Sequence, residues 1–347
     1  MKVYDNIIIG GGQAALSVAY FFRRYKLDYL ILDNQVAAGG SWLQTWDSLS
    51  LFSPTTFSSL SGWMMPKGEH DYPTKEDFIA YLRAYEDRYK MPIQRPVQVQ
   101  HVNKKDQLFE VHTNVGSYSC KTLVSATGSS NNPHIPKYAG YELFEGQQLH
   151  SYDYRNSKEL PGKKTLIIGG GNSGAQILAE VSKVADTQWV TLEAPKFLPD
   201  DVDGRVLFHE ATNKFFNKSS EKPVNYSLGD IVMVPSVKEA RQRDVLHARR
   251  PFKSFFEKGV IWEDGTKELF DTVIWCTGFK PDFVHLQSLD VVENGRIPTQ
   301  FTRSKKEPNL WLVGYGSWTG FASATIYGVG KTAKQTAMKI NEALQEG

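Results

Sequence analysis

The stretch Asn6-Ile-Ile-Ile-Gly10-Gly-Gly-Gln-Ala-Ala15 decides the fold of this chain. Its first four residues are mainly apolar and predict a short strand, and the glycines after it predict a turn into a helix that ends near Arg24. A second strand is predicted over Tyr29–Asp33. The chain therefore opens with a βαβ unit, and we call residues 10–15 the first glycine loop.

The first glycine loop has the residue types that a dinucleotide-binding turn needs. Gly10 permits the tight turn, Gly12 lets the backbone approach a pyrophosphate, and Ala15 lets the helix pack closely on the strand. The helix begins at the phosphates, where its unpaired amides and the positive end of its dipole attract an anion. Asp33 follows the loop by about 20 residues, the spacing at which a carboxylate binds the ribose hydroxyls.

The same pattern restarts about halfway along the chain. A predicted strand over Thr165–Ile168 leads into Gly169-Gly-Gly-Asn-Ser-Gly174, the second glycine loop, and into a helix predicted to end near Val184. The next strand is predicted over Thr187–Glu193, with Glu193 as the acid that follows the loop. The chain thus contains two copies of one βαβ unit, which predicts two bound dinucleotides.

The remaining elements complete an α/β fold with two Rossmann-like dinucleotide-binding domains. A helix is predicted near Lys75–Tyr89, a hairpin around Gln98–Val124, a strand over Leu310–Val313 and a last helix from about Ala322 to Glu346. The segments 125–128 and 275–278 each close a strand and predict the points where the chain crosses between domains. We therefore expect an FAD-binding domain of residues 1–157 and 277–347, with an NAD(P)H-binding domain of residues 158–276 inserted in it.

The usual pair of dinucleotides in one chain is a flavin and a nicotinamide. We assign FAD to the first domain, because only this domain is completed by the C-terminal return of the chain, and NADH or NADPH to the second. The predicted FAD-binding residues are Gly10, Gly12, Gln13, Ala14, Ala15, Asp33, Asn34, Gly40, Ser41, Trp42, Ala126, Thr127 and Gly128. The predicted NAD(P)H-binding residues are Gly169, Gly171, Asn172, Ser173, Gly174, Glu193, Ala194, Thr277 and Gly278.

The composition is that of a globular protein with two domains. Of the 347 residues, 41% are hydrophobic and 22% are charged, and the net charge of +2 gives no reason to expect nucleic acid or membrane as a partner. No apolar stretch approaches the ~20 residues that span a bilayer, and no signal peptide precedes the first strand, so we expect a cytoplasmic protein. Cys120 and Cys276 lie in separate apolar runs and are expected to be buried thiols. The acidic run Asp200–Asp203 is expected to be a solvated loop, and no metal site is predicted.

One segment between the two loops resembles a known family. The stretch Phe144-Glu-Gly-Gln-Gln-Leu-His150-Ser-Tyr-Asp-Tyr154 matches the FxGxxxHxxxY signature of the flavin-containing monooxygenases. Further matches are Gly39-Gly-Ser-Trp42, Tyr72-Pro-Thr-Lys75, Ala126-Thr-Gly128 and the prolines at 133 and 136. Over nearly its whole length the chain resembles a short bacterial member of this family. Related Baeyer–Villiger enzymes carry Trp at the place of Tyr154, so the flavin-containing subgroup is favoured.

The resemblance implies an enzyme in which NAD(P)H reduces FAD and dioxygen forms a hydroperoxide at flavin carbon 4a. One oxygen atom then passes to a soft nucleophile, so small sulfides and amines are the implied substrates, with Baeyer–Villiger oxidation of small ketones as a further activity. The cofactor carries the hard chemistry, and no catalytic triad is expected. The family's counterpart of His150 is structural or couples the domains. The sequence leaves a homodimer open.

A first departure from the family pattern concerns the flavin pocket. Many members place an Asn over the flavin where this chain has Phe52, with Ser53 beside it, so hydrogen-bond support for the hydroperoxide is reduced. Loss of that support makes an NAD(P)H oxidase that releases hydrogen peroxide one alternative function. A flavin-bearing redox sensor or accessory protein is another. A disulfide reductase needs a redox-active cysteine pair, which Cys120 and Cys276 do not form.

A second departure concerns the choice of nicotinamide. NADPH-specific members place Arg and a small hydroxyl residue where this chain has Glu193 and Ala194. A carboxylate accepts hydrogen bonds from ribose hydroxyls and repels a 2′-phosphate, so we expect NADH to be used at least as well as NADPH. Lys196 or Arg205 in reach of a phosphate would keep the use of both open.

Overall fold

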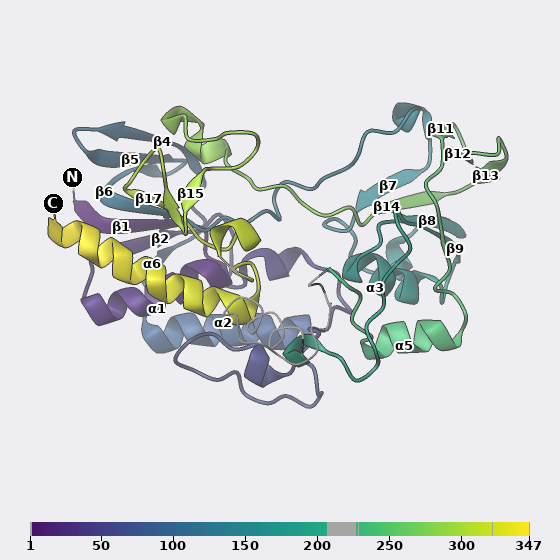
Figure 1. The fold of residues 1–347 in the computed structure, drawn as a ribbon, viewed down its shortest axis with the longest axis horizontal. Coiled ribbons are helices and arrows are strands. Elements are labelled where there is room, and N and C mark those ends of the chain that lie inside the picture. Colours follow the sequence, from purple (N-terminus) through teal and green to yellow (C-terminus); the bar gives the residue numbers. More distant parts are fainter. Residues whose placement is uncertain (1, 207–226, 228, 321, 347) are drawn as a thin grey trace, which may run out of the picture. The chain divides into compact units, whose positions relative to one another are not determined.

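The computed structural model describes residues 2–206, 227, 229–320 and 322–346, which fold as two compact units (Figure 1). The first unit comprises Met1–Leu43, Thr55–Asn132 and Lys280–Gly347, and the second comprises Gln44–Pro54 and Pro133–Phe279. The second unit is larger than the inserted domain predicted at 158–276, because it also takes residues 133–157 and a short earlier piece of chain.

A nine-stranded sheet forms the centre of the first unit. Its strands are β1 (Val3–Ile9), β2 (Tyr29–Leu32), β3 (Ile93–Gln94), β4 (Val99–Lys105), β5 (Leu108–Thr113), β6 (Gly116–Ser125), β15 (Thr299–Gln300), β16 (Arg303–Ser304) and β17 (Leu310–Leu312). The order is β15-β16-β17-β6-β1-β2-β3, and β4 and β5 form a hairpin in which β5 pairs with β6. The strands from β17 to β3 are parallel, as a βαβ connection requires.

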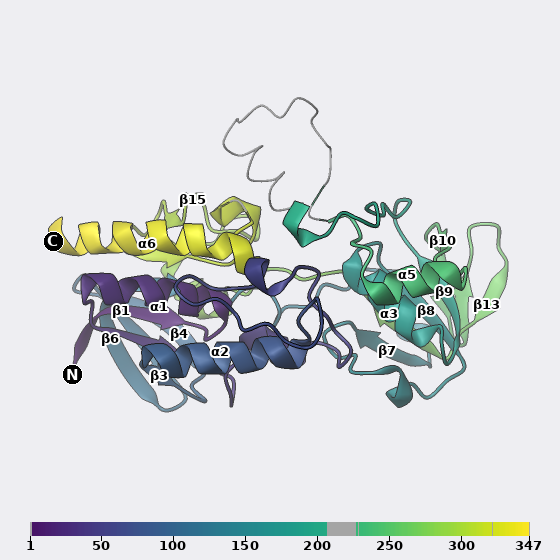
Figure 2. The same cartoon turned by 90° about the horizontal axis from the view of Figure 1, so that it is seen from below.

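The α-helices in the described part of the first unit are α1 (Gln13–Tyr25), α2 (Lys75–Tyr89) and α6 (Ile326–Glu346). α1 and α6 pack side by side (Figure 2). α2 begins with a capping box, in which the Thr74 hydroxyl accepts from the Asp77 amide at 3.1 Å and the Asp77 carboxylate accepts from the Thr74 amide at 2.9 Å. α1 begins after Gly12 and has no side-chain cap, so its first amides keep their hydrogen-bonding capacity.

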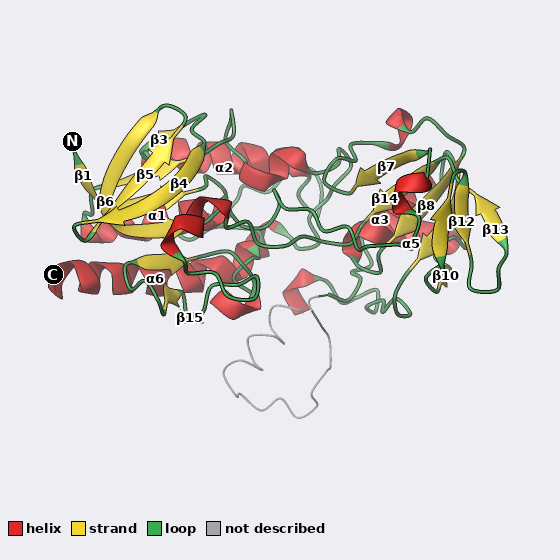
Figure 3. Cartoon of the chain, turned by 90° about the horizontal axis from the view of Figure 1, so that it is seen from above, coloured by secondary structure: helices red, strands yellow, loops and turns green. Residues whose placement is uncertain are grey.

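The second unit repeats the parallel arrangement on a smaller scale (Figure 3). Its larger sheet has five strands, β7 (Gln147–His150), β8 (Lys164–Ile168), β9 (Asp186–Val190), β10 (Ala248–Arg249) and β14 (Thr272–Trp275), in the order β10-β9-β8-β14-β7. Its helices include α3 (Asn172–Val181) and α5 (Pro235–Gln242). β7 precedes the second glycine loop in sequence but pairs with β14, which explains why the unit begins before residue 158.

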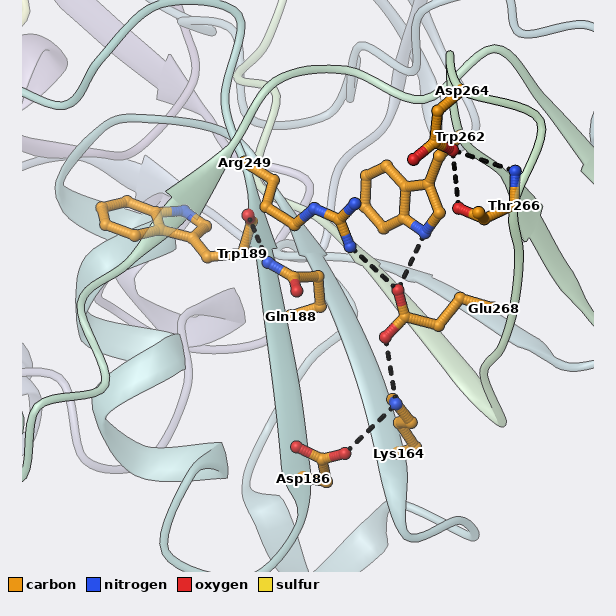
Figure 4. A network of polar contacts seen from close by, with 9 residues as sticks. All are labelled: Lys164, Asp186, Gln188, Trp189, Arg249, Trp262, Asp264, Thr266 and Glu268. Atoms are coloured by element: carbon orange, nitrogen blue, oxygen red, sulfur yellow. Dashed lines mark hydrogen bonds and ion pairs between the residues drawn. The ribbon is translucent and has the colours of Figure 1, made fainter.

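A second, antiparallel sheet of three strands lies in this unit: β11 (Ser254–Phe256), β12 (Gly259–Ile261) and β13 (Lys267–Leu269). Glu268 links it to the larger sheet (Figure 4). The Glu268 carboxylate accepts from Trp262 Nε1 at 2.8 Å and from Arg249 at 3.2 Å, and pairs with Lys164 at 3.0 Å. The Arg249 guanidinium stacks on Trp262, 3.6 Å from the ring centre. This network fixes the side chain that ends β10.

The predicted elements occur, with shifted ends. The strand predicted over Thr187–Glu193 ends at Val190, and the last helix begins at Ile326 rather than Ala322. The region predicted as a hairpin, Gln98–Val124, holds three strands because β6 continues the β4–β5 hairpin into the parallel sheet. In the part of the chain that the structure describes, no helix has the length and apolar character to cross a membrane.

A buried polar cluster joins the ends of three segments in the first unit. The Ser125 hydroxyl contacts His285 Nε2 at 3.0 Å and the Tyr315 hydroxyl at 2.6 Å, and Tyr315 also reaches the Thr127 hydroxyl at 2.7 Å. Burial lowers the pKa of His285 from 6.5 to about 4, so the imidazole is neutral in the folded protein at neutral pH.

We expect the first unit to lose stability in mild acid because of His285. The folded-state pKa lies below the unfolded value, so the unfolded chain takes up the proton first as the pH falls from 6.5 to about 4. The full difference corresponds to on the order of 3 kcal/mol of unfolding free energy. Urea unfolding at several pH values should show this slope in the wild type and a flatter one in His285→Asn.

The exposed histidine His70 of the first unit provides the matched control for this experiment. His70→Asn should keep the wild-type slope, because it leaves the buried imidazole of His285 unchanged. An unchanged slope in His285→Asn would show that protonation of the buried imidazole does not limit stability in acid.

Candidate dinucleotide-binding sites

The two glycine loops have the same backbone hydrogen bonds to the strands around them. The Gly10 amide donates to Leu32 O at 2.8 Å, and the Gly169 amide donates to Val190 O at 2.9 Å. On the other side, the Ala126 amide donates to Ile9 O at 2.8 Å and the Cys276 amide to Ile168 O at 2.7 Å. The internal duplication predicted from the sequence is therefore a duplication of structure, and each residue of one loop has a counterpart in the other.

In both loops the first glycine lies against a carbonyl group. Gly10 has φ +102° and Gly169 has φ +134°, a backbone conformation that favours glycine. A Cβ on Gly10 would lie 2.7 Å from Ala126 O, and a Cβ on Gly169 would collide with Cys276 O. The third small residue also packs closely: Ala15 is fully buried, and a Cβ on Gly174 would collide with Gly169 O. These contacts bring each helix against its sheet.

Each loop ends at an uncapped helix N-terminus. α1 follows Gly12 and α3 follows Gly171, and neither helix has a side-chain cap. Within α1 the first helical hydrogen bond is from Leu16 to Gly12 O, so the amides before Leu16 have no partner in the helix itself. Gly40 lies so close to Gly12 that a Cβ on it would be 2.6 Å from Gly12 Cα. Amides and glycine backbone at such a close approach fit a pyrophosphate.

The side chains that follow the two glycine triplets hold neighbouring segments in place. Gln13 accepts from Trp42 Nε1 at 3.0 Å and donates to Ala324 O at 3.0 Å. Asn172 donates to Asp230 O at 3.1 Å and accepts from the Val232 amide at 2.9 Å. The backbone of Gln13 and Asn172 lies at the anion-binding end of each helix, and their side chains are structural.

Asp33, which directly follows β2, is buried at the first glycine loop, as its predicted role requires. A Cβ on Gly11 would collide with its carboxylate, so Asp33 and the loop are in contact. Asp33 Oδ2 accepts from Arg95 Nε at 2.6 Å, and the rest of the Arg95 guanidinium forms two hydrogen bonds to Glu86, at 2.7 and 2.8 Å. Gly11, Glu86 and Arg95 are not among the residues predicted from the sequence patterns.

The counterpart of Asp33 in the second unit is Thr191. It directly follows β9, is buried, and lies 3.3 Å from the place of a Cβ on Gly170, the counterpart of Gly11. Glu193 lies two residues further on, is exposed, and corresponds to Gln35 in the first unit. The expectation that Glu193 occupies the same position as Asp33 is therefore wrong, because β9 ends at Val190 and Thr191 is the residue that directly follows it.

A second arginine, Arg250, occupies the place of Arg95 in the second unit. The Asp33 amide donates to Gln94 O at 3.1 Å, and the Thr191 amide donates to Arg249 O at 3.0 Å. Gln94 and Arg249 therefore occupy equivalent positions, and so do the residues that follow them, Arg95 and Arg250. Arg250 is exposed and forms no ion pair or hydrogen bond with its side chain among residues 2–206, 227, 229–320 and 322–346. Its position is visible only once β3 and β10 are aligned.

The other predicted site residues lie at the rims of the two loops. Ala14 is buried in the first turn of α1, and Ser173 is partly buried in the first turn of α3. Asn34 and Ser41 are exposed near the first loop, and Ala194 is exposed beyond the second. Thr127 donates to Asp282 O at 3.2 Å and Thr277 donates to His134 O, so each threonine holds a connecting segment. Gly128 and Gly278, with φ of +67° and +76°, turn the chain after these threonines.

The residues of the FxGxxxHxxxY signature shape the second unit. Phe144 packs in its core, and a Cβ on Gly146 would collide with the Phe144 ring. His150 accepts from the Tyr152 amide at 3.1 Å and lies 3.0 Å from Gly278 O, so Nε2 carries the proton. Burial lowers the pKa of His150, which keeps it neutral. These contacts hold the segment at Gly278 and give His150 no acid–base partner among the described residues.

The last signature residue, Tyr154, is fully buried and donates to Glu180 Oε1 on α3 at 2.9 Å. Burial raises the pKa of its hydroxyl. Phe52 and Ser53 also belong to the second unit: Phe52 packs beside its core and Phe52 O accepts from the Gly204 amide at 2.9 Å. Their place over a flavin stays a prediction.

Three acidic residues in the run 200–203 were expected to be solvated. Asp200 and Asp201 are exposed, and Asp200 forms two hydrogen bonds with Arg241, at 2.7 and 2.9 Å. Asp203 differs from the prediction, because it is buried and pairs with Arg205 at 2.9 Å. Of the two basic residues considered for contact with a 2′-phosphate, Arg205 pairs with Asp203 and Lys196 is exposed. Over the described ranges, no group of three His, Cys, Asp or Glu side chains is arranged to hold a metal ion.

Two glycine loops with this packing define a two-domain α/β oxidoreductase fold that binds dinucleotides. The sequence pattern of the pyridine nucleotide-disulphide oxidoreductases matches residues 7–314. A flavin-containing monooxygenase from Stenotrophomonas maltophilia is 44% identical, with a TM-score of 0.91 over 99% of each chain. The uncharacterized oxidoreductase CzcO of Bacillus velezensis is 32% identical over 98% of this chain and 99% of its own length.

The chain therefore belongs to the pyridine nucleotide-disulphide oxidoreductase family and, within it, to the flavin monooxygenases. This confirms the resemblance that rested on residues 144–154 and makes the protein an enzyme of the oxidoreductase class. A cyclohexanone monooxygenase shares the fold, with a TM-score of 0.71 at 16% identity over 100% of this chain and 88% of the other. The family implies the use of a flavin and a nicotinamide.

We expect Gly11→Ala to lower the amount of flavin that copurifies with the protein. The new Cβ would collide with the Asp33 carboxylate and displace it from the first glycine loop. The matched control is Gly171→Ala in the second loop, where a Cβ would meet nothing within 4 Å. The absorbance of bound flavin relative to protein absorbance should fall in Gly11→Ala and stay at the wild-type value in Gly171→Ala. Full flavin content in Gly11→Ala would show that Asp33 is not part of the flavin site.

Proposed function

We propose that this protein is an FAD-dependent monooxygenase that uses NAD(P)H and dioxygen to oxygenate small soft nucleophiles. Small sulfides are the first substrates to test, followed by amines and by small ketones in a Baeyer–Villiger oxidation. The single observation that carries the proposal is the pair of equivalent glycine loops, each with an uncapped helix N-terminus, in a chain of the flavin monooxygenase family. FAD is assigned to the loop at Gly10 and the nicotinamide to the loop at Gly169.

Each loop supplies what its cofactor needs. Gly10, Gly11 and Gly12 let the backbone approach a pyrophosphate, the first amides of α1 bind its charge, and Asp33 accepts hydrogen bonds from the ribose. Bound FAD would accept a hydride from the nicotinamide and activate dioxygen, and the protein orients both and excludes water. His150 contributes by holding the chain at Gly278 and not by moving a proton.

The two cysteines do not favour disulfide reduction. Cys120 lies in β6 of the first unit and Cys276 follows β14 of the second, and both are buried. Burial raises the pKa of Cys276 to about 12 and also raises that of Cys120, so neither is a reactive thiolate at neutral pH. The redox chemistry of this chain is therefore assigned to its cofactors.

The position of Glu193 and Arg250 supports the use of both nicotinamides, with NADH used at least as well as NADPH. Thr191 leaves no carboxylate at the ribose position itself, and the exposed Glu193 lies two residues beyond it. Glu193 disfavours the 2′-phosphate of NADPH, whereas Arg250, without a carboxylate partner among the described residues, favours it. The two charges oppose each other at the same end of the dinucleotide.

The reaction itself can be tested with the purified protein, NADH, dioxygen and methyl phenyl sulfide. We expect the sulfoxide to form in proportion to the NADH consumed, because the flavin monooxygenase family transfers one oxygen atom to its substrate. Hydrogen peroxide without sulfoxide would instead identify an NAD(P)H oxidase, and no consumption of NADH would identify a redox sensor or accessory protein. Asp33→Asn, which removes the carboxylate proposed to bind the ribose of FAD, provides a flavin-depleted control.

We expect Glu193→Arg to raise kcat/KM for NADPH relative to NADH by on the order of tenfold, because it replaces repulsion of the 2′-phosphate by attraction. Arg250→Gln should shift the same ratio in the opposite direction. Arg249→Gln is the matched control, since Arg249 is held by Glu268 and Trp262 and should leave the ratio unchanged. Steady-state kinetics with both nicotinamides measure the ratio. Equal shifts in Arg249→Gln and Arg250→Gln would contradict the role of Arg250.

A further inference from the structure

Arg95 lies between two buried carboxylates in the first unit. Asp33 and Glu86 are both buried, and the Arg95 side chain is 15% exposed. The guanidinium uses Nε for Asp33, at 2.6 Å, and both terminal nitrogens for Glu86, at 2.7 and 2.8 Å. Burial raises the pKa of the Glu86 carboxyl even though Arg95 acts in the opposite direction. An ion cluster of this kind is poor evidence for stability, because desolvation offsets much of the attraction.

The second unit keeps the arginine but not the cluster. Arg95 and Arg250 follow equivalent strands, β3 and β10, and each is followed by a proline. The residue that faces each glycine loop is Asp33 in the first unit and Thr191 in the second. Arg250 has no carboxylate partner among the described residues, so the fold does not require an arginine at this position to be paired. The cluster is therefore specific to the loop assigned to FAD.

The geometry of the cluster determines which oxygen of Asp33 is free. Oδ2 is held by Arg95 and lies against Gly11. Oδ1 accepts one long hydrogen bond, 3.3 Å from the Gln35 amide, and has no other partner in the described part of the chain. Because Glu86 takes two parallel hydrogen bonds, the guanidinium plane is fixed and Nε can point only toward Asp33. A lysine ammonium has no such plane and could not orient the carboxylate in this way.

We propose that Arg95, fixed by Glu86 on α2, is a positioning residue for flavin binding: it holds one oxygen of Asp33 so that the other is presented to the ribose of FAD. The proposal rests on the assignment of FAD to the first glycine loop. It assigns to Glu86 the role of anchoring the arginine, and it makes the adenosine half of the flavin the part that the cluster recognises. Arg95 does not touch the cofactor and acts through Asp33.

The affinity of the apoprotein for FAD and for FMN tests this proposal. FMN lacks the adenosine half, so its binding does not depend on Asp33. We expect Arg95→Lys to weaken FAD binding about tenfold or more and to leave FMN binding unchanged, measured by quenching of flavin fluorescence. Glu86→Gln should weaken FAD binding in the same direction. Arg88 lies on α2, as Glu86 does, but its side chain is exposed over the Trp63 ring. The control variant Arg88→Lys should bind both flavins as the wild type does.

A double-mutant cycle separates positioning from a direct or a general structural role. If Arg95 acts through Asp33, Arg95→Lys added to Asp33→Asn should weaken FAD binding no further than Asp33→Asn alone. Additive effects, equal losses of FAD and FMN affinity, or wild-type FAD affinity in Arg95→Lys would each overturn the proposal. Failure of the wild-type protein to bind FAD would overturn the proposed function as well, so the two failures are distinguishable.

Discussion

In each unit a glycine lies directly against the carbonyl group of the residue that follows the neighbouring strand, Gly10 against Ala126 and Gly169 against Cys276. No side chain fits between the glycine and this carbonyl group. The turn from the strand into the helix therefore lies in close contact with the neighbouring strand's end. The helix N-terminus then faces the carboxyl end of the sheet, where the strand order leaves room for a ligand. The threonine and the positive-φ glycine that follow each carbonyl carry the chain away from this edge. The close approach of each helix N-terminus to its sheet follows from that one contact.

The sequence was sufficient for the two loops because their requirements are local. Glycines, a preceding strand and a following helix lie within about 20 residues of one another, and each contributes through the backbone. The position of Glu193 could not be predicted in this way. A spacing of about 20 residues does not determine which residue directly follows the strand, and β9 ends at Val190. Arg95 lies 62 residues beyond Asp33 in the sequence, and no sequence pattern relates the two residues. Pairing across sheets and helices decides such contacts, and only the folded chain displays it.

The signature segment shows that a diagnostic motif need not be a catalytic one. Phe144, Gly146, His150 and Tyr154 each contact another part of the second unit: its core, the neighbouring chain at Asp271, the backbone at Gly278 and α3. The segment supplies the edge strand β7 and ties it to the loop that follows β14. A motif that identifies the family thus secures the geometry of the second unit, and its histidine is neutral because it is buried.

The two sheets are completed by strands from different places in the sequence. β17 (Leu310–Leu312), which pairs with β6, follows the segment that forms the second unit, whereas β7 (Gln147–His150), which pairs with β14, precedes the second glycine loop. Synthesis on the ribosome proceeds from the N-terminus, and domains fold as units as they emerge. The second unit is complete once Phe279 has been made, but β6 of the first unit then still has an open edge. An unpaired parallel edge is prone to association with other chains. The residues of the second unit are therefore all synthesised before β17, the strand that closes this edge of the first unit's sheet.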